Sequence, residues 1–116
     1  MGGALAVFGA MSIQRKGVPC DLYTWGQPRT GDSDFAKYYT ENFEGAYYRF
    51  TYRNDPVPLS PMNYALNKHH SGRQIHFYEC AHNAFVPYNG DFEDKQFSDM
   101  SLWDDHHGYF CLATDL

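Results

Sequence analysis

The sequence predicts an α/β domain whose sheet is incomplete. An apolar run with helical spacing opens the chain, and no strand pattern stands in front of it. Segments rich in aromatic and β-branched residues follow, and a second helical pattern separates the first two of them. About three strands with flanking helices do not make a sheet that is covered on both faces. We therefore expect the first helix to need sheet neighbours that this chain does not supply.

The first helix is expected to run from Met1 towards Arg15. Leu5, Phe8 and Met11 recur at helical spacing, and the glycines and alanines between them leave a smooth surface. No charge appears before Arg15, and the cations, glycine and proline of residues 15–19 end the helix. Such an apolar helix is expected to bury most of its circumference. Because the first N–H groups of a helix need partners, we expect that a preceding segment has been cut off.

Alternation and capping signals predict the remaining elements. In the first strand, Leu22 and Thr24 are expected to face opposite Tyr23 and Trp25. The polar residues 32–34 offer an N-cap to the second helix. The expected elements are a strand over 20–25, a helix after 32–34, strands over 46–52 and 74–80, a long loop over 81–101 and a closing helix over 104–112.

The composition excludes several classes of protein. Hydrophobic residues make up 43% of the 116 residues, so the chain can form a packed core. The formal net charge of -5 argues against a nucleic-acid partner, which needs a basic face. No apolar run is long enough to span a bilayer, and no signal peptide is visible. The odd number of cysteines leaves the pairing of Cys20, Cys80 and Cys111 open.

Several short motifs occur in order along the chain. Residues 1–6 look like the end of G-x-S-x-G-G-A-L-A, and residues 23–31 are similar to Y-T-F-G-x-P-R-x-G. Further matches are F-A-x-Y at 35–38, N-D-x-V-P at 54–58, H-x-G-x-E-I at 70–75 and D-H-x-x-Y-F at 105–110. Together they resemble the class 3 (fungal-type) lipases. The resemblance implies the C-terminal part of an α/β-hydrolase fold, starting just after the nucleophilic serine.

The resemblance also implies ester hydrolysis by a Ser-His-Asp triad. In that mechanism a serine attacks the carbonyl, a histidine takes its proton, and a carboxylate orients the imidazole. By resemblance Asp55 is the triad carboxylate and His106 is the base. The serine would be the residue immediately before Met1, whose backbone N–H would be one oxyanion-hole donor.

Each of these assignments has a simpler alternative. Asp55 precedes Pro56, and this pattern is also typical of a turn. His107 competes with His106, although at most one of them can meet Asp55. A metal site among the six histidines is disfavoured because H-x-x-x-H and H-E-x-x-H spacings are absent. We therefore expect no metal and no organic cofactor.

We expect residues 1–116 to be a partial fungal-type lipase-like domain that lacks its N-terminal half. The parent would hydrolyse acylglycerols or other carboxylic esters in lipid metabolism, and this chain alone would be inactive. The alternative is a non-catalytic lipase-like protein that binds lipid or a protein partner through an aromatic-rich surface. The expected partners are a lipid or ester substrate and a peripheral lipid interface, with no nucleic acid and no stable oligomer. By resemblance alone, the expected location is extracellular.

Overall fold

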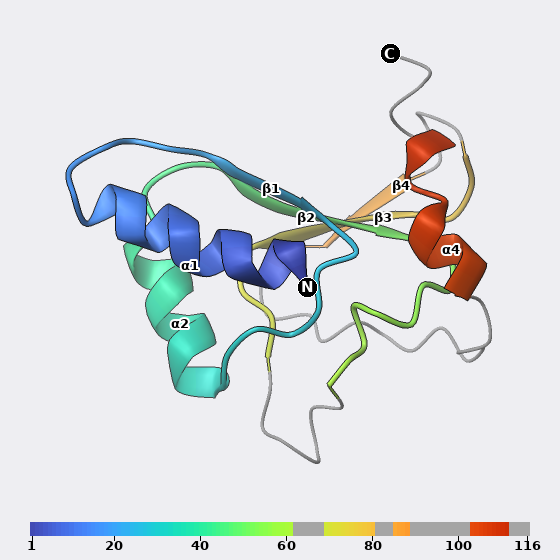
Figure 1. Ribbon diagram of the computed structural model, residues 1–116, viewed down its shortest axis with the longest axis horizontal. Coiled ribbons are helices and arrows are strands. Elements are labelled where there is room, and N and C mark those ends of the chain that lie inside the picture. Colours follow the sequence, from blue (N-terminus) through green and yellow to red (C-terminus); the bar gives the residue numbers. More distant parts are fainter. Residues whose placement is uncertain (62–68, 81–84, 89–102, 112–116) are drawn as a thin grey trace.

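The computed structural model describes residues 1–61, 69–80, 85–88 and 103–111 (Figure 1). The elements within these residues are α1 (Gly2–Gln14), β1 (Leu22–Trp25), α2 (Ser33–Asn42), β2 (Tyr47–Tyr52), β3 (Arg73–Phe77), β4 (Phe85–Tyr88) and α4 (Trp103–His107). Strands β1, β2 and β3 are parallel, and β4 pairs antiparallel with β3 in one sheet of order β1-β2-β3-β4. The predicted α/β class and the incomplete sheet are confirmed, and the structure adds a fourth strand, β4, to the three that were expected.

Helices α1 and α2 cover one face of the sheet (Figure 1). Val7 of α1 and Tyr39 of α2 are fully buried there, in contact with Leu22 and Tyr47 of the sheet. The Tyr39 hydroxyl donates a hydrogen bond to the Val7 carbonyl at 3.0 Å and ties the helices together. The same face carries buried polar side chains, because strand register aligns them across β1, β2 and β3. These are Thr24, Arg49, Thr51, Gln74 and His76.

The opposite face of the sheet is aromatic. Tyr23 and Trp25 point to this side, as the alternation in β1 predicts, and they are 46% and 52% exposed. A row of ring contacts runs from β1 to β4. Its centroid distances are 5.2 Å for Trp25–Phe50, 6.2 Å for Phe50–Phe77 and 5.6 Å for Phe77–Phe85.

Helix α1 buries less of its surface than its composition predicts. Val7 and Ala10 face the core, whereas Leu5 is 64% and Phe8 is 51% exposed. The expectation that this helix buries most of its circumference is therefore wrong for this chain. A helix that is apolar all round carries no stripe that selects the buried side, so packing against the sheet decides it.

Two further expectations need correction. The expected loop over 81–101 contains β4, whose Pro87 stands opposite Ile75 of β3. Proline is tolerated there because β4 pairs with β3 alone among the described strands, and an edge strand does not need every N–H. The closing helix is shorter than expected, since α4 ends at His107 and Leu112 lies outside the described residues.

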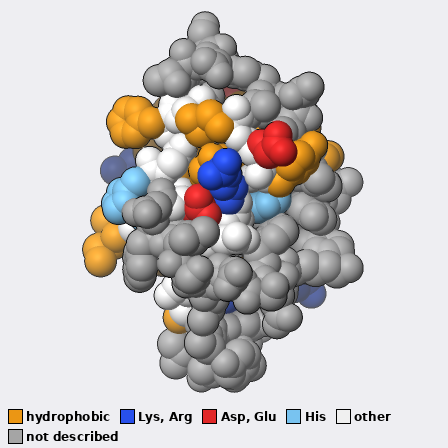
Figure 2. All heavy atoms as spheres, turned by 90° about the vertical axis from the view of Figure 1, so that its right-hand side faces the viewer, with side chains coloured by type: hydrophobic (Ala, Val, Ile, Leu, Met, Phe, Trp, Pro, Cys, Tyr) orange, Lys and Arg blue, Asp and Glu red, His pale blue; other side chains and the backbone are white. Residues whose placement is uncertain are grey.

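The carboxyl ends of the parallel strands lie at one edge of the sheet, and α4 lies beside that edge (Figure 1). Figure 2 views the molecule from this side and shows basic, acidic and histidine side chains close together in the middle of the face. In open α/β sheets this edge is where ligands bind. Within the described residues, no helix has the length and apolarity needed to cross a bilayer.

Candidate active site

Asp55 stands in the turn that follows β2. The turn is tight because Arg53 takes a positive φ of 43° and the Asp55 N–H donates to the Tyr52 carbonyl at 3.1 Å. The carboxylate accepts the Val57 N–H at 2.9 Å, so it forms the turn that its position before Pro56 predicts. The Asp55 side chain is only 1% exposed. A carboxylate this deeply buried needs further donors.

His106 supplies one of these donors. Its Nδ1 lies 3.1 Å from Oδ1 and 3.0 Å from Oδ2 of Asp55. The histidine comes from α4, across a separation of 51 residues in the sequence. His107, the competing candidate, is exposed. The structure thus brings Asp55 and His106 together.

Tyr109 donates to the same carboxylate. Its hydroxyl lies 2.7 Å from Asp55 Oδ2 and accepts the backbone N–H of Tyr52 at 3.1 Å. Three donors therefore surround one buried carboxylate and fix its orientation. The sequence pattern alone gives Tyr109 no role, although this residue belongs to the D-H-x-x-Y-F match.

Gly26 packs directly on the Asp55–His106 pair. A Cβ on this residue would lie 2.9 Å from Asp55 Oδ2 and 2.9 Å from His106 Cε1. Gly26 also has a φ of 58°, which favours glycine. This contact explains why a glycine follows β1 within the Y-T-F-G-x-P-R-x-G match. A glycine inside such a motif is the signal by which its role could have been found.

Gln27 links this glycine to the start of α1. Its side chain is 1% exposed, accepts the Thr24 hydroxyl at 2.7 Å and donates to the Tyr47 hydroxyl at 2.9 Å. On the other side, a Cβ on Gly3 would lie 3.1 Å from Gln27 Cβ, so α1 approaches closely. The amino-terminal end of α1, where Met1 is the N-cap, therefore packs on the segment that contacts the Asp55–His106 pair.

Arg29 braces the loop that carries Asp55. It is buried, and its Nη1 donates to the carbonyls of Leu59 and Pro61, the second at 2.9 Å. Its backbone N–H also donates to the Ser60 carbonyl at 2.9 Å. The Y-T-F-G-x-P-R-x-G segment thus contacts the Asp55–His106 pair through Gly26 and the loop that follows Asp55 through Arg29.

The other histidines that raised a metal site are dispersed where the structure describes them. His70 Nε2 lies 2.8 Å from the Pro58 carbonyl oxygen, and His76 Nδ1 lies 2.8 Å from Thr51 Oγ1 inside the sheet face. His82 lies outside the described residues. Among the described histidine, cysteine and acidic side chains, no three gather as metal ligands do.

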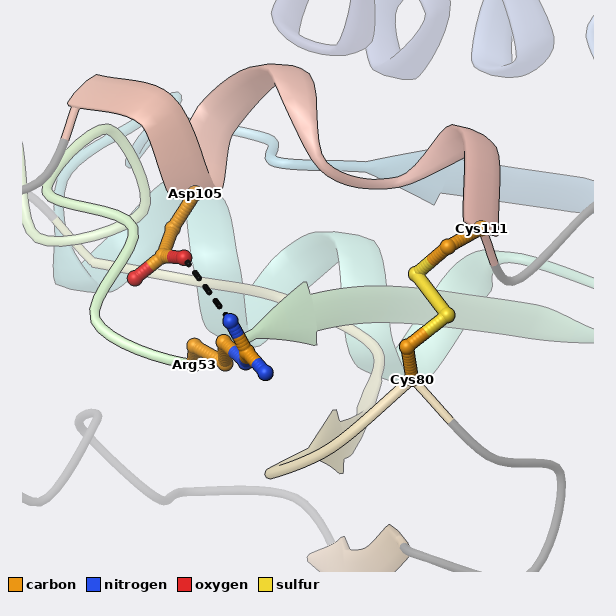
Figure 3. The surroundings of a disulfide bond; sticks show 4 residues. All are labelled: Arg53, Cys80, Asp105 and Cys111. Atoms are coloured by element: carbon orange, nitrogen blue, oxygen red, sulfur yellow. Dashed lines mark ion pairs between the residues drawn. A yellow bond between two sulfur atoms is a disulfide. The ribbon is translucent and has the colours of Figure 1, made fainter.

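The structure pairs Cys80 with Cys111 in a disulfide, which the sequence left open, and leaves Cys20 free (Figure 3). The bond joins the segment after β3 to the segment after α4, with Cα atoms 5.8 Å apart. Disulfides persist in oxidising compartments, so this pairing is typical of a secreted protein.

Comparison with known proteins gives consistent matches. The family model of Lipase (class 3) matches residues 1–65. Secreted mono- and diacylglycerol lipase 1 of Fusarium solani is 46% identical over 61 residues, which cover 53% of this chain and 18% of the Fusarium protein. Secreted mono- and diacylglycerol lipase A of Penicillium cyclopium is 41% identical over 63 residues, covering 53% of this chain and 20% of that protein.

Solved structures extend the similarity over more of the chain. A fungal lipase in complex with an inhibitor has a TM-score of 0.82 and 30% identity, covering 99% of this chain and 46% of that one. A triacylglycerol lipase whose catalytic centre is a serine protease triad has a TM-score of 0.75 and 29% identity, covering 90% and 42%. The chain thus spans less than half the length of these solved lipases.

Proposed function

Because this chain belongs to the class 3 lipase family, we propose that it supplies the carboxylate and the histidine of a Ser-His-Asp site for carboxylic-ester hydrolysis. Asp55 is the carboxylate and His106 is the base. The observation that carries the proposal is the contact of His106 Nδ1 with both Asp55 oxygens, at 3.1 and 3.0 Å.

The geometry supports a base that works through Nε2. With the Nδ1 proton held by Asp55, the lone pair of neutral His106 lies on Nε2, on the far side of the ring. Nε2 takes the proton of the attacking serine and later gives it to the leaving alcohol, and a water then releases the acyl group by the same route. The buried Asp55 carboxylate stabilises the imidazolium that forms in between.

We further propose that residues 1–116 are the C-terminal part of a lipase domain, with the nucleophilic serine immediately before Met1. The support is the G-G-A-L-A match and the packing of Gly3 on Gln27, beside the segment that contacts His106. The Met1 backbone N–H would then be an oxyanion-hole donor. One such donor contributes about 100- to 1,000-fold in rate.

The proposed substrates are acylglycerols, and the proposed location is extracellular. Two relatives are named secreted mono- and diacylglycerol lipases, and the Cys80–Cys111 disulfide is consistent with an oxidising compartment. The proposed partner is therefore a lipid surface that presents the ester. No metal or organic cofactor takes part in the proposed mechanism.

A fluorophosphonate probe tests the proposal, because it labels an activated serine. The chain of residues 1–116 should not be labelled. The natural gene product, isolated from its source, should be labelled on a serine that peptide sequencing finds immediately before Met1. Labelling of a serine within residues 1–116 contradicts the assignment, and so does an unlabelled natural product.

One observation favours a second candidate, a non-catalytic lipase-like protein. Tyr23 and Trp25 are half exposed on the aromatic face of the sheet, and exposed aromatic patches mark binding surfaces. This alternative predicts that the natural product resists the probe and still binds lipid vesicles or a partner protein. Loss of that binding in the Trp25→Ala variant would support it.

A further inference from the structure

The segment that carries His106 has little structure of its own to hold it. Helix α4 has five residues, Trp103–His107, and helices this short are not stable alone. The His106 side chain is 29% exposed, so its contact with Asp55 is not enforced by burial. Contacts with the sheet must therefore keep this segment in place.

The first anchor point is Asp105, the residue before His106. Its Oδ2 accepts the backbone N–H of Asn54 at 3.2 Å, and Asn54 directly precedes Asp55. Its Oδ1 lies 3.9 Å from Arg53 Nη1, an ion pair that contributes little because the arginine is half exposed. The backbone contact is the stronger one, since the Asp105 side chain is only 9% exposed.

The second anchor point is the Cys80–Cys111 disulfide. Figure 3 shows Asp105 and Cys111 towards opposite ends of the segment that carries His106, both directed towards the sheet. Cys80 follows β3, and β3 is fixed to β2 beside the Asp55 turn through the bond from the Arg53 N–H to the Phe77 carbonyl at 2.8 Å. Asp55 and Cys80 therefore both follow neighbouring parallel strands that end at the same edge of the sheet.

We infer that Asp105 and the Cys80–Cys111 disulfide are positioning residues that hold His106 against Asp55 from both sides. The inference rests on the proposed function only where the contact of His106 with Asp55 is called catalytic. Asp55 follows β2, β2 pairs with β3, and the disulfide joins the chain after β3 to the segment that carries His106. The contact of His106 with Asp55 completes this loop of contacts.

Opening the disulfide removes the covalent link between this segment and the chain that follows β3, so that the contacts of Asp105 and Tyr109 and the chain that follows Tyr88 of β4 remain to hold it. His106 then spends less of its time against the carboxylate, because the larger loop allows more conformations.

Proton NMR of the 116-residue chain reads this geometry directly. A histidine Nδ1 proton that is bonded to a carboxylate resonates far downfield of the amides, and absence of the signal from the His106→Gln variant assigns it. We expect the signal in the wild type and in the Cys20→Ser variant. We expect its loss in the Cys80→Ser/Cys111→Ser variant and after reduction. Retention of the full signal in the open form overturns the inference.

The amide signals of Val7 and Tyr39 report whether each variant is folded. A second pair of variants keeps the test decisive if the cysteine variant does not fold. Asp105→Asn keeps an acceptor for the Asn54 N–H and should retain the signal, whereas Asp105→Ala should lose most of it. If the cysteine variant unfolds, this pair decides, and equal signals in both overturn the inference. The readout does not depend on hydrolysis. An inactive natural product with an intact signal would contradict the proposed function and leave the positioning inference standing.

Discussion

Replacing Gly26 by alanine tests the packing of this residue on the Asp55–His106 pair. Alanine at a φ of 58° costs about 1–2 kcal/mol, because the left-handed region is unfavourable for residues with a Cβ. The new Cβ would also lie 2.9 Å from both Asp55 Oδ2 and His106 Cε1. Overpacking of this kind adds about 1–3 kcal/mol. We expect a total loss of about 2–5 kcal/mol in the free energy of unfolding.

Gly17→Ala is the matched control. Gly17 has a φ of 78°, and a Cβ there would meet nothing within 4 Å. It carries the backbone cost without the contact, and the effect of alanine on the unfolded chain cancels between the two variants. Urea unfolding followed by circular dichroism measures both. Equal losses for Gly26→Ala and Gly17→Ala would refute the packing of Gly26 on the pair.

Three further predictions concern the surroundings of the site and the core. Tyr109→Phe removes the donor to the Asp55 carboxylate and should lower the free energy of unfolding by about 1.5–3 kcal/mol. The control Tyr38→Phe, at an exposed position, should change it by less than about 0.5 kcal/mol. Equal losses in the two variants would contradict the role of Tyr109. Burial raises the pKa of Tyr39 above its ordinary value, so the unfolded state releases this proton first and stability should fall as the pH rises above about 10. Urea titrations between about pH 8 and 11.5 should show that the free energy of unfolding falls less with pH in Tyr39→Phe than in the wild type. If it falls equally in both proteins, Tyr39 is not the group responsible. Cys80 and Cys111 are 31 residues apart, so loss of their disulfide should lower the free energy of unfolding by about 3.7 kcal/mol through the loop entropy of the unfolded chain. If the Cys80→Ser/Cys111→Ser variant loses no more than Cys20→Ser, the disulfide does not stabilise the fold.

Local patterns in the sequence predicted the elements that local chemistry decides. The alternation of Leu22 and Thr24 with Tyr23 and Trp25 predicted the two faces of β1, because side chains on a strand alternate whatever lies beyond them. Asp32 caps α2 as expected, and its carboxylate accepts the Phe35 N–H at 2.8 Å. Both features depend on neighbours within a few residues.

Features that depend on distant partners were not accessible from the pattern. Tyr109 and Asp55 are 54 residues apart, and only the fold shows that they meet. Arg49 and His76 lie buried on a polar sheet face, where a strand pattern predicts apolar side chains. The pairing of Cys80 with Cys111 equally depends on how β3 and α4 are arranged.

The candidate site was reached from the motifs rather than from spacing. Asp55 before Pro56 reads as a turn, and it does form that turn through the Val57 N–H. Spacing alone does not distinguish His106 from His107, and the D-H-x-x-Y-F match was needed to choose His106. In the structure His106 contacts the carboxylate, whereas His107 is exposed. The catalytic roles of Asp55 and His106 stay predictions.

The most direct test of the proposed triad compares His106→Gln with His107→Gln in the natural gene product. Hydrolysis of a short-chain ester gives kcat and KM for each variant. The proposed mechanism predicts that His106→Gln lowers kcat by a factor of at least about 1,000, because it removes the general base, and that His107→Gln changes kcat by less than about threefold. Similar kcat values for the two variants, or a larger loss for His107→Gln, would contradict the assignment of His106 as the base.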